Sequence, residues 1–368
     1  MCRAGLCFCL WSITSVLVWA ESAADRAAQG PLAPIDLFVR GEGGYHTYRI
    51  PALVTSGKGT VLAFCEGRKN SPRDDGDIDL LLRRSFDGGA TWQPVQLVYE
   101  EGGSAPITIG NPCPIVSADG TIHLLFSRNN QRAFYTRSTD EGATFSAPRE
   151  ISDSFRAFEF NAQRLGTGPV HGIQTSSSRL LAPVWLNDKI GGEYRSAVLF
   201  SDDGGSTWTA GGVVAADVKG CNECSVAELA DGTLVLNMRN RQAKLRAESR
   251  STDGAQTWSR PRMVESLIDA ECQGALLGVV WHNRRMLLFS NAADPKRVRM
   301  TVRLSNDGAQ TWPAARLLDP GPSAYSDLAI TAEGSVLCLY ECGEKGPYQR
   351  LRLVRFGIDW LRTAARPE

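Results

Sequence analysis

An eight-residue pattern, Ser-x-Asp-x-Gly-x-Thr-Trp, occurs five times along this chain and limits its possible folds more than any other feature. The copies begin at Ser85, Ser138, Ser201, Ser251 and Ser305, at intervals of 53, 63, 50 and 54 residues. The second copy ends in Phe145, and the last two carry Ala255 and Ala309 in place of the glycine. A repeat of this length indicates one supersecondary unit for each copy.

The chemistry of the repeat is that of a tight turn between two strands. The aspartate accepts backbone hydrogen bonds within the turn, the glycine tolerates positive φ, and the aromatic ring fills the hydrophobic layer of the sheet. We therefore interpret the five repeat aspartates as structural and not catalytic. They are Asp87, Asp140, Asp203, Asp253 and Asp307.

Short β-strands are expected between the repeats. Segments such as 61–65, 122–128, 180–185 and 234–238 are rich in apolar and β-branched residues. Helical periodicity is nearly absent, so the predicted fold class is all-β. Repeats of this length, each supplying a small sheet, are typical of a β-propeller.

The chain length sets the number of blades. About 335 residues remain once the N-terminal segment is set aside, and division by the repeat interval gives about six blades. The sequence thus predicts a six-bladed β-propeller over residues 36–356, closed by pairing of its two ends. Residues 25–35 are expected to form a linker, and residues 357–368 a C-terminal tail.

The N-terminal segment has the features of an export signal. Arg3 precedes an apolar stretch from Leu6 to Trp19, and the small residues Ala23 and Ala24 follow it. This arrangement predicts a signal peptide over residues 1–24 and a secreted or periplasmic protein, with a retained N-terminal anchor as the alternative. No other segment approaches the roughly 20 apolar residues that a bilayer requires, so no stable membrane insertion is expected after the signal is removed.

Charge and cysteine content argue against several classes of function. Lys and Arg together number 40, as do Asp and Glu, so no basic excess exists to drive nucleic-acid binding. Cys221 and Cys224 suggest a redox pair or half of a zinc site, but no second cysteine or histidine pair accompanies them. We therefore expect neither a metal nor another cofactor.

Several short motifs, taken together with the repeats, resemble those of the exo-α-sialidases, or neuraminidases, over nearly the whole chain that follows the signal. The motifs are Tyr48-Arg49-Ile50-Pro51, Cys65-Glu66-Gly67-Arg68, Asp74-Asp75-Gly76-Asp77, Asn222-Glu223-Cys224, Asn237-Met238-Arg239, Tyr325-Ser326-Asp327 and Tyr340-Glu341. In this family the repeat forms the Asp-box turn of a six-bladed propeller. The resemblance implies an enzyme that acts on sialylated glycans: glycoproteins, glycolipids or oligosaccharides.

Three arginines are implied as the site for the substrate carboxylate. Sialic acid carries a carboxylate on its anomeric carbon, and planar guanidinium groups match a carboxylate geometrically. Arg49 and Arg239 match two arginines of the family. The third precedes the last repeat, where Arg297, Arg299 and Arg303 compete, and Arg297 has the spacing usual in the family.

The nucleophile implied by the resemblance is Tyr325. A carboxylate nucleophile would be repelled by the substrate carboxylate, and sialidases are glycosidases that use a tyrosine for this step. A phenol with a pKa near 10 is a poor nucleophile at neutral pH, so a base must accept its proton. Glu223 matches that base.

Three further residues match functional positions of the family. Asp74 matches the general acid that protonates the leaving group, with Asp75 as its rival. Glu341 matches a glutamate that orients Arg49, and Arg68 matches an arginine that lines the substrate pocket.

The expected function is hydrolysis of terminal α-linked sialic acid, with retention of configuration through a tyrosyl-linked intermediate. A trans-sialidase, or an enzyme that releases an anhydro sugar, would keep the same catalytic residues, and the sequence does not separate these activities. A non-catalytic propeller that binds glycans or peptides would also carry such repeats. That scaffold would have no need to keep Tyr325, Glu223 and Asp74 together with the arginines, which favours the enzyme.

Overall fold

The computed structural model describes Met1, residue 26 and residues 28–363. The expected signal peptide therefore lies outside the described residues, apart from Met1. The described chain is almost entirely β-structure, with two short helices, α2 (Ser152–Arg156) and α3 (Ile358–Arg362). No helix in this part is long and apolar enough to cross a membrane.

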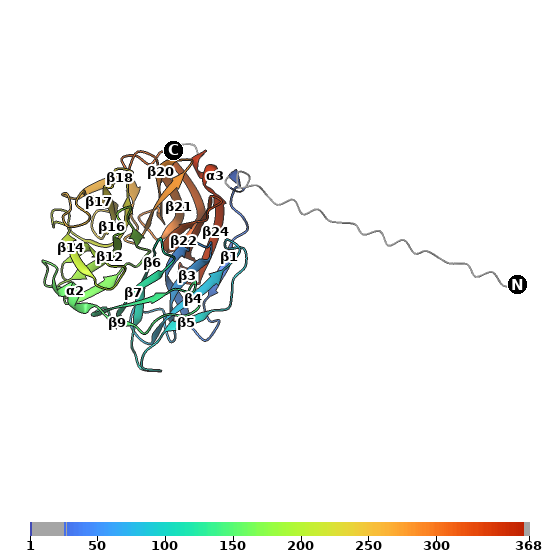
Figure 1. The fold of residues 1–368 in the computed structure, drawn as a ribbon, viewed down its shortest axis with the longest axis horizontal. Coiled ribbons are helices and arrows are strands. Elements are labelled where there is room, and N and C mark those ends of the chain that lie inside the picture. Colours follow the sequence, from blue (N-terminus) through green and yellow to red (C-terminus); the bar gives the residue numbers. More distant parts are fainter. Residues whose placement is uncertain (2–25, 27, 364–368) are drawn as a thin grey trace.

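Four antiparallel sheets follow one another around a common centre (Figure 1). The first contains β2 (Thr47–Thr55), β3 (Val61–Arg68), β4 (Ile78–Ser85) and β5 (Gln96–Tyr99). The second contains β6 (Ile109–Val116), β7 (Ile122–Arg128), β8 (Arg132–Ser138) and β9 (Arg149–Glu150). The third contains β10 (Arg164–Thr167), β11 (Ile173–Gln174), β12 (Leu180–Asn187), β13 (Tyr194–Ser201) and β14 (Thr209–Val213). The fourth contains β15 (Cys221–Glu228), β16 (Leu234–Asn240), β17 (Leu245–Ser251) and β18 (Arg262–Ile268).

The remaining strands form two blades that share one long strand. They are β19 (Ala275–Trp281), β20 (Arg284–Ala292), β21 (Val298–Ser305), β22 (Ala314–Ile330), β23 (Ser335–Cys342), β24 (Arg350–Gly357) and β1 (Ile35–Val39). The first part of β22 pairs with β21 and its last part pairs with β23. Strand β22 is thus the outer strand of the fifth blade and the inner strand of the sixth. Divided at this strand, the sheets make the six-bladed propeller that the sequence predicts.

The two ends of the chain meet in the sixth blade. Strand β1 pairs antiparallel with β24, and the two lie side by side in Figure 1. The predicted closure by end pairing is therefore confirmed. Residues 358–362, expected as part of a tail, instead form α3, whose Ile358 and Leu361 are buried in the core.

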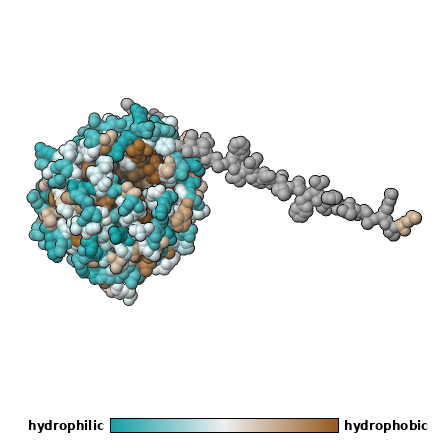
Figure 2. Space-filling view, viewed as in Figure 1, coloured by the Kyte–Doolittle hydropathy of each residue, from teal (hydrophilic) through white to brown (hydrophobic). Residues whose placement is uncertain are grey.

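The hydrophobic core lies between neighbouring blades. Phe64 and Leu62 of the first blade pack with Leu124 and Phe126 of the second in one cluster. Because each blade has a neighbour on both faces, inner strands such as β3 are buried along their whole length. The surface visible in Figure 2 is mainly hydrophilic, with hydrophobic residues in small patches.

The five repeats form the turns between the third and fourth strands of the first five blades. In the first copy, Asp87 accepts hydrogen bonds from Ser85 Oγ (2.8 Å), Thr91 N (2.8 Å) and Thr91 Oγ1 (2.6 Å), and Ser85 Oγ accepts one from Gly89 N (2.8 Å). The same four bonds recur in the other copies. Each carboxylate is thus used in its own turn, which supports the structural interpretation.

Candidate active site

A cavity of about 300 Å³ collects most of the residues that the sequence motifs singled out. Its lining includes Arg68, Asp74, Glu223, Arg239 and Tyr325. These side chains come from the first, fourth and sixth blades. Residues far apart in the sequence therefore meet in one concave site.

Tyr325 and Glu223 form a direct pair in this cavity. Tyr325 Oη on β22 donates a hydrogen bond of 2.5 Å to Glu223 Oε1 on β15. Burial and the neighbouring Glu223 charge raise the pKa of Tyr325 well above its usual value, against the opposing charges of Arg239 and Arg297. The phenol is thus protonated at rest, and the carboxylate beside it is placed to accept its proton.

Arg239 contacts both members of this pair. Its Nη1 lies 2.5 Å from Glu223 Oε2 and 3.1 Å from Tyr325 Oη. Arg239 and Glu223 lie on the paired strands β16 and β15, which are joined by the expected turn at Asp231-Gly232. Gly232 adopts a φ of 83° there, a conformation that glycine permits.

Arg49 is held by the fully buried carboxylate of Glu341. Arg49 Nε and Nη2 donate to the two oxygens of Glu341 at 3.0 and 3.2 Å, which is the two-point geometry of an arginine–carboxylate pair. The same carboxylate accepts the main-chain amides of Ile50 (2.9 Å) and Tyr325 (3.3 Å). Glu341 therefore positions both the guanidinium of Arg49 and the backbone that carries Tyr325.

Of the three arginines that compete before the last repeat, Arg297 lies at this site. Its Cζ atom is 5.7 Å from the ring centre of Tyr325, and Arg49 Cζ lies 5.2 Å from the same centre. Arg303 is buried elsewhere and donates to Asn291 at 3.1 Å, while Arg299 is exposed at the start of β21. Geometry thus favours Arg297 as the partner of Arg49 and Arg239.

Asp74 lies against the arginines and Asp75 does not. Asp74 Oδ1 is 2.8 Å from both Arg49 Nη1 and Arg68 Nη1, although 78% of its side chain is exposed. Partial desolvation acts to raise the pKa of Asp74, but Arg49, Arg68 and Arg297 outweigh it and hold that pKa below its usual value. Asp75 pairs with the exposed Arg73.

Comparison with known proteins places this geometry in a family. A family model described as a BNR repeat-like domain matches residues 59–338. The chain belongs to the BNR repeat-like family. A sialidase of Micromonospora viridifaciens is 29% identical over 396 residues, covering 97% of this chain and 60% of that protein. Sialidase-3 of Mus musculus is 28% identical and covers 87% of this chain and 93% of that protein.

Solved structures of sialidases match this chain, in agreement with the sialidases found by sequence. The Hadza microbial sialidase Hz136 matches with a TM-score of 0.80 and 26% identity, covering 89% of this chain and 69% of that one. A Trypanosoma rangeli sialidase matches with a TM-score of 0.75 and 21% identity, covering 90% and 60% of the two chains, and supports the fold alone. The resemblance to the exo-α-sialidases drawn from the motifs is confirmed. This member of the BNR repeat-like family spans about 60% of the length of the bacterial sialidases it matches.

Several residues that line the cavity of this BNR repeat-like protein lie outside the motifs that the sequence analysis linked to a function. They are Asn111, Asn130, Arg164, Trp185, Tyr194 and Arg241, from the second, third and fourth blades. Glu66 lies in the Cys65-Glu66-Gly67-Arg68 motif, and its carboxylate accepts hydrogen bonds from Arg68 Nη2 at 2.7 Å and from the main-chain amide of Asn111 at 3.0 Å, contacts that the motif alone does not predict. Tyr348, which contacts Arg49 and Arg297, was also missed because it lies in a loop with no repeat or motif.

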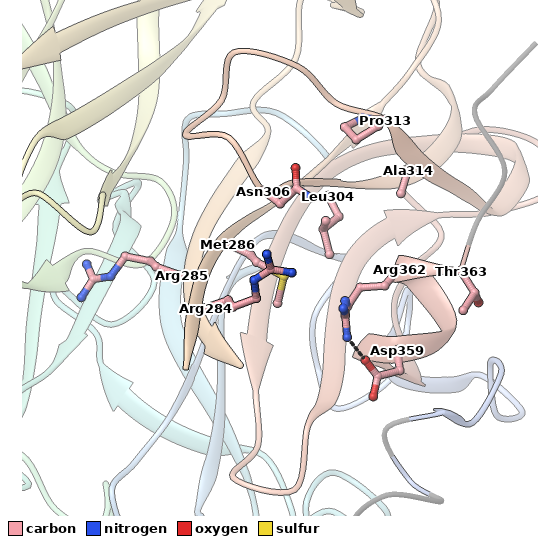
Figure 3. A pocket seen from close by; sticks show the side chains of 10 residues that line it. All are labelled: Arg284, Arg285, Met286, Leu304, Asn306, Pro313, Ala314, Asp359, Arg362 and Thr363. Carbon is pink, nitrogen blue, oxygen red and sulfur yellow. Dashed lines mark hydrogen bonds and ion pairs between the residues drawn. The ribbon is translucent and has the colours of Figure 1, made fainter. Parts of the chain in front are cut away.

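A second cavity, of about 860 Å³, lies between the fifth blade and α3 (Figure 3). Its charged lining includes Arg284, Arg285 and an ion pair between Asp359 and Arg362 at 2.6 Å. Among the described residues that line it, there is no nucleophile with an adjacent base, so this cavity is a weaker candidate than the arginine site. Among the described residues, the seven cysteines are free and buried, and no cluster of three metal-ligating side chains occurs.

Proposed function

We propose that this chain is a retaining exo-α-sialidase that hydrolyses terminal α-linked sialic acid from glycoproteins, glycolipids and oligosaccharides. The observation that carries the proposal is the 2.5 Å hydrogen bond between Tyr325 and Glu223, beside the guanidinium groups of Arg49, Arg239 and Arg297. A phenol with its own base, next to an anion site, suits attack on a carbon that bears a carboxylate. The sialidase relatives support the same reaction.

In this proposal the three arginines bind the carboxylate on the anomeric carbon. Arg49 Nη1 now contacts Asp74, so the substrate carboxylate competes with Asp74 for that nitrogen. Loss of the Arg49 contact removes one of the charges that depress the pKa of Asp74. Substrate binding thus favours the protonated form of Asp74 that a general acid requires.

The first step forms the tyrosyl intermediate. The oxygen of Tyr325 attacks the anomeric carbon while its proton passes to Glu223. The bond from that carbon to the leaving oxygen breaks, the electron pair stays on the leaving oxygen, and Asp74 donates the proton it takes up. Glu223 is then neutral, Asp74 is ionised, and the sugar is linked to Tyr325.

The second step reverses these roles. Asp74 takes a proton from water as the water oxygen attacks the anomeric carbon from the face that the leaving group occupied. The bond to Tyr325 breaks, its electron pair returns to the phenol oxygen, and Glu223 gives back the proton. Two displacements at one carbon leave the original configuration.

Release of a fluorescent phenol from an aryl α-sialoside tests the proposal. The wild type is expected to release the phenol, and Tyr325→Phe to lose almost all turnover because the nucleophilic oxygen is gone. Tyr135→Phe removes a phenol that binds His123 in the second blade, outside the site, and serves as the matched control. A wild type that binds the sialoside without cleaving it would identify a binding propeller and refute the hydrolase.

We also propose that the chain is exported, as the Arg3 and Leu6–Trp19 segment suggests. N-terminal sequencing of protein recovered from the medium or periplasm tests this. A processed N-terminus near residue 25 is expected, and retention in the cytoplasm with an intact Met1 would contradict it.

A further inference from the structure

Arg297 differs from the other two arginines of the site in the groups that hold it. Arg49 and Arg239 are each bound by a buried carboxylate. Arg297 instead donates from Nη1 to the phenol oxygen of Tyr348 at 2.6 Å, and from Nη2 to the main-chain oxygen of Glu271 at 2.9 Å. Both acceptors are neutral. Within the described part of the chain, no carboxylate lies within ion-pair distance of Arg297.

Tyr348 touches two arginines of the site at once. It lies in the loop between β23 and β24, and its ring centre is 4.2 Å from Arg49 Cζ. A guanidinium over an aromatic face at this distance is attracted by the ring. The ring also packs against an apolar cluster that includes Ile50, Cys272 and Tyr325. One side chain from the sixth blade thus links an arginine of the first blade to an arginine of the fifth.

The Tyr348 phenol, compared with a carboxylate at the same place, changes the charge at Arg297. A carboxylate at this place would hold Arg297 equally well, but it would cancel its charge and compete with the anionic substrate. A phenol oxygen fixes the guanidinium through a charge-assisted hydrogen bond and leaves the positive charge in place. Arg297 therefore retains the uncancelled charge of the arginine cluster.

We propose that Tyr348 is a positioning residue that holds Arg49 and Arg297 together around one substrate carboxylate without neutralising Arg297. The inference rests on the proposed function and adds a residue to it. It assigns Tyr348 to recognition of the carboxylate, and not to the chemical step that Tyr325 and Glu223 perform.

The first test separates binding from chemistry. In Tyr348→Phe the ring over Arg49 remains and the hydrogen bond to Arg297 is lost, so KM for an aryl α-sialoside should rise about tenfold, the scale of one hydrogen bond to a charged group. The value of kcat should change less than KM. Competitive inhibition by free sialic acid should weaken by the same factor, whereas inhibition by its methyl ester, which lacks the negative charge, should hardly change.

The second test isolates charge at constant shape. Tyr348→Gln and Tyr348→Glu place side chains of equal length beside Arg297, one neutral and one anionic. The Glu variant should bind free sialic acid at least tenfold more weakly than the Gln variant, because its carboxylate pairs with Arg297. Raising the salt concentration should narrow that gap. Comparison of these two variants remains informative even if Tyr348→Phe folds poorly.

The outcomes separate this inference from the function on which it rests. Tyr135→Phe, the control outside the site, should keep the wild-type KM. If the wild type cleaves sialosides but Tyr348→Phe keeps the wild-type KM and sialic acid inhibition, or if Glu and Gln at position 348 bind alike, the role of Tyr348 is refuted and the sialidase stands. A wild type that neither cleaves nor binds sialosides refutes both.

Discussion

Glu341 binds Arg49 at two points, 3.0 and 3.2 Å, across the junction between the last blade and the first. Both side chains are buried, so the ion pair lies at the point where the ring of blades closes. The site and the interface between the first and last blades therefore share this ion pair.

Glu341→Gln should lower the free energy of unfolding by about 3 kcal/mol, because it leaves the buried charge of Arg49 with only the exposed carboxylate of Asp74 as an ionic partner. Urea denaturation followed by tryptophan fluorescence measures this. Asp75→Asn breaks the exposed pair with Arg73 and should leave the free energy of unfolding almost unchanged, because solvent screens this pair. Equal losses in the two variants would show that the Glu341 pair does not stabilise the closure.

Tyr325→Gly should change the stereochemical course of the reaction. The variant leaves space for water on the face that the phenol occupied, and a single displacement by that water inverts the anomeric carbon. On an aryl α-sialoside, turnover should fall by roughly 10³-fold or more, as when a nucleophile and base act as one unit. Proton NMR of the first sugar released should show the α-anomer for the wild type and the β-anomer for the variant. Retained configuration at near-normal turnover would remove Tyr325 as the nucleophile.

Asp74→Ala should discriminate between leaving groups. Loss of a general acid costs about 10²–10⁴-fold on natural glycans, whose leaving oxygen needs a proton, and far less on aryl sialosides with acidic phenols. The ratio of kcat/KM for the two substrates measures the effect. Asp75→Ala, the neighbouring control, should leave the ratio unchanged. An equal loss of kcat/KM on both substrates in Asp74→Ala would indicate that Asp74 has a structural role in its loop and is not the general acid.

Asp140→Asn should destabilise the protein at neutral pH but not in strong acid. Hydrogen bonds from Thr144 and Ser138 lower the pKa of Asp140 from 3.8 to about 2, against a slight desolvation that acts to raise it. The ionised carboxylate therefore contributes its full stability above the ordinary pKa, and that contribution is lost as the pH falls through about 2. The variant should be less stable by about 1 kcal/mol at neutral pH, and the difference should shrink as the solution is acidified. A difference in stability between the wild type and Asp140→Asn that does not change with pH would contradict a stabilising role for the ionised carboxylate of Asp140.

Gly205→Ala should destabilise the protein more than Gly89→Ala does. The two glycines hold the same repeat position with φ of 83° and 87°, so the backbone strain added by alanine is matched. An added Cβ would lie 2.3 Å from Tyr135 Oη at residue 205, but 3.3 Å from Leu337 Cδ2 at residue 89. Overpacking should add about 1–3 kcal/mol at residue 205 alone, measured by thermal unfolding of both variants. Equal melting temperatures would disprove the steric argument.

The sequence predicts the blades well because each repeat encodes a local turn. Five repeats serve six blades for a topological reason: in the sixth blade the third and fourth strands are β24 and β1, which are not consecutive and need no turn between them. Length, and not the number of repeats, predicted that blade. The shared strand β22 leaves no trace in the sequence, because a continuous strand carries no turn signal at the point where it changes blades.

The residues of the candidate site also fall into two groups, those that a local motif predicts and those that no motif predicts. Arg49, Glu223 and Tyr325 lie in motifs whose residue types follow from the proposed chemistry, and the structure brings them together. Tyr348 acts through the positions of its ring and hydroxyl relative to residues distant in sequence. Such a role depends on tertiary packing, for which a single sequence has no local pattern.

The pairing of β1 with β24 also has a consequence during translation. The ribosome delivers β1 before the other five blades, but the strand on which it docks consists of residues 350–357, which emerge after those blades. Until β24 emerges, β1 has no strand on which to dock, and until residues 341–348 emerge, Arg49 lacks the neighbours that Glu341 and Tyr348 supply. We therefore expect a polypeptide that terminates before residue 341 to lack the completed arginine site on which the proposed function depends.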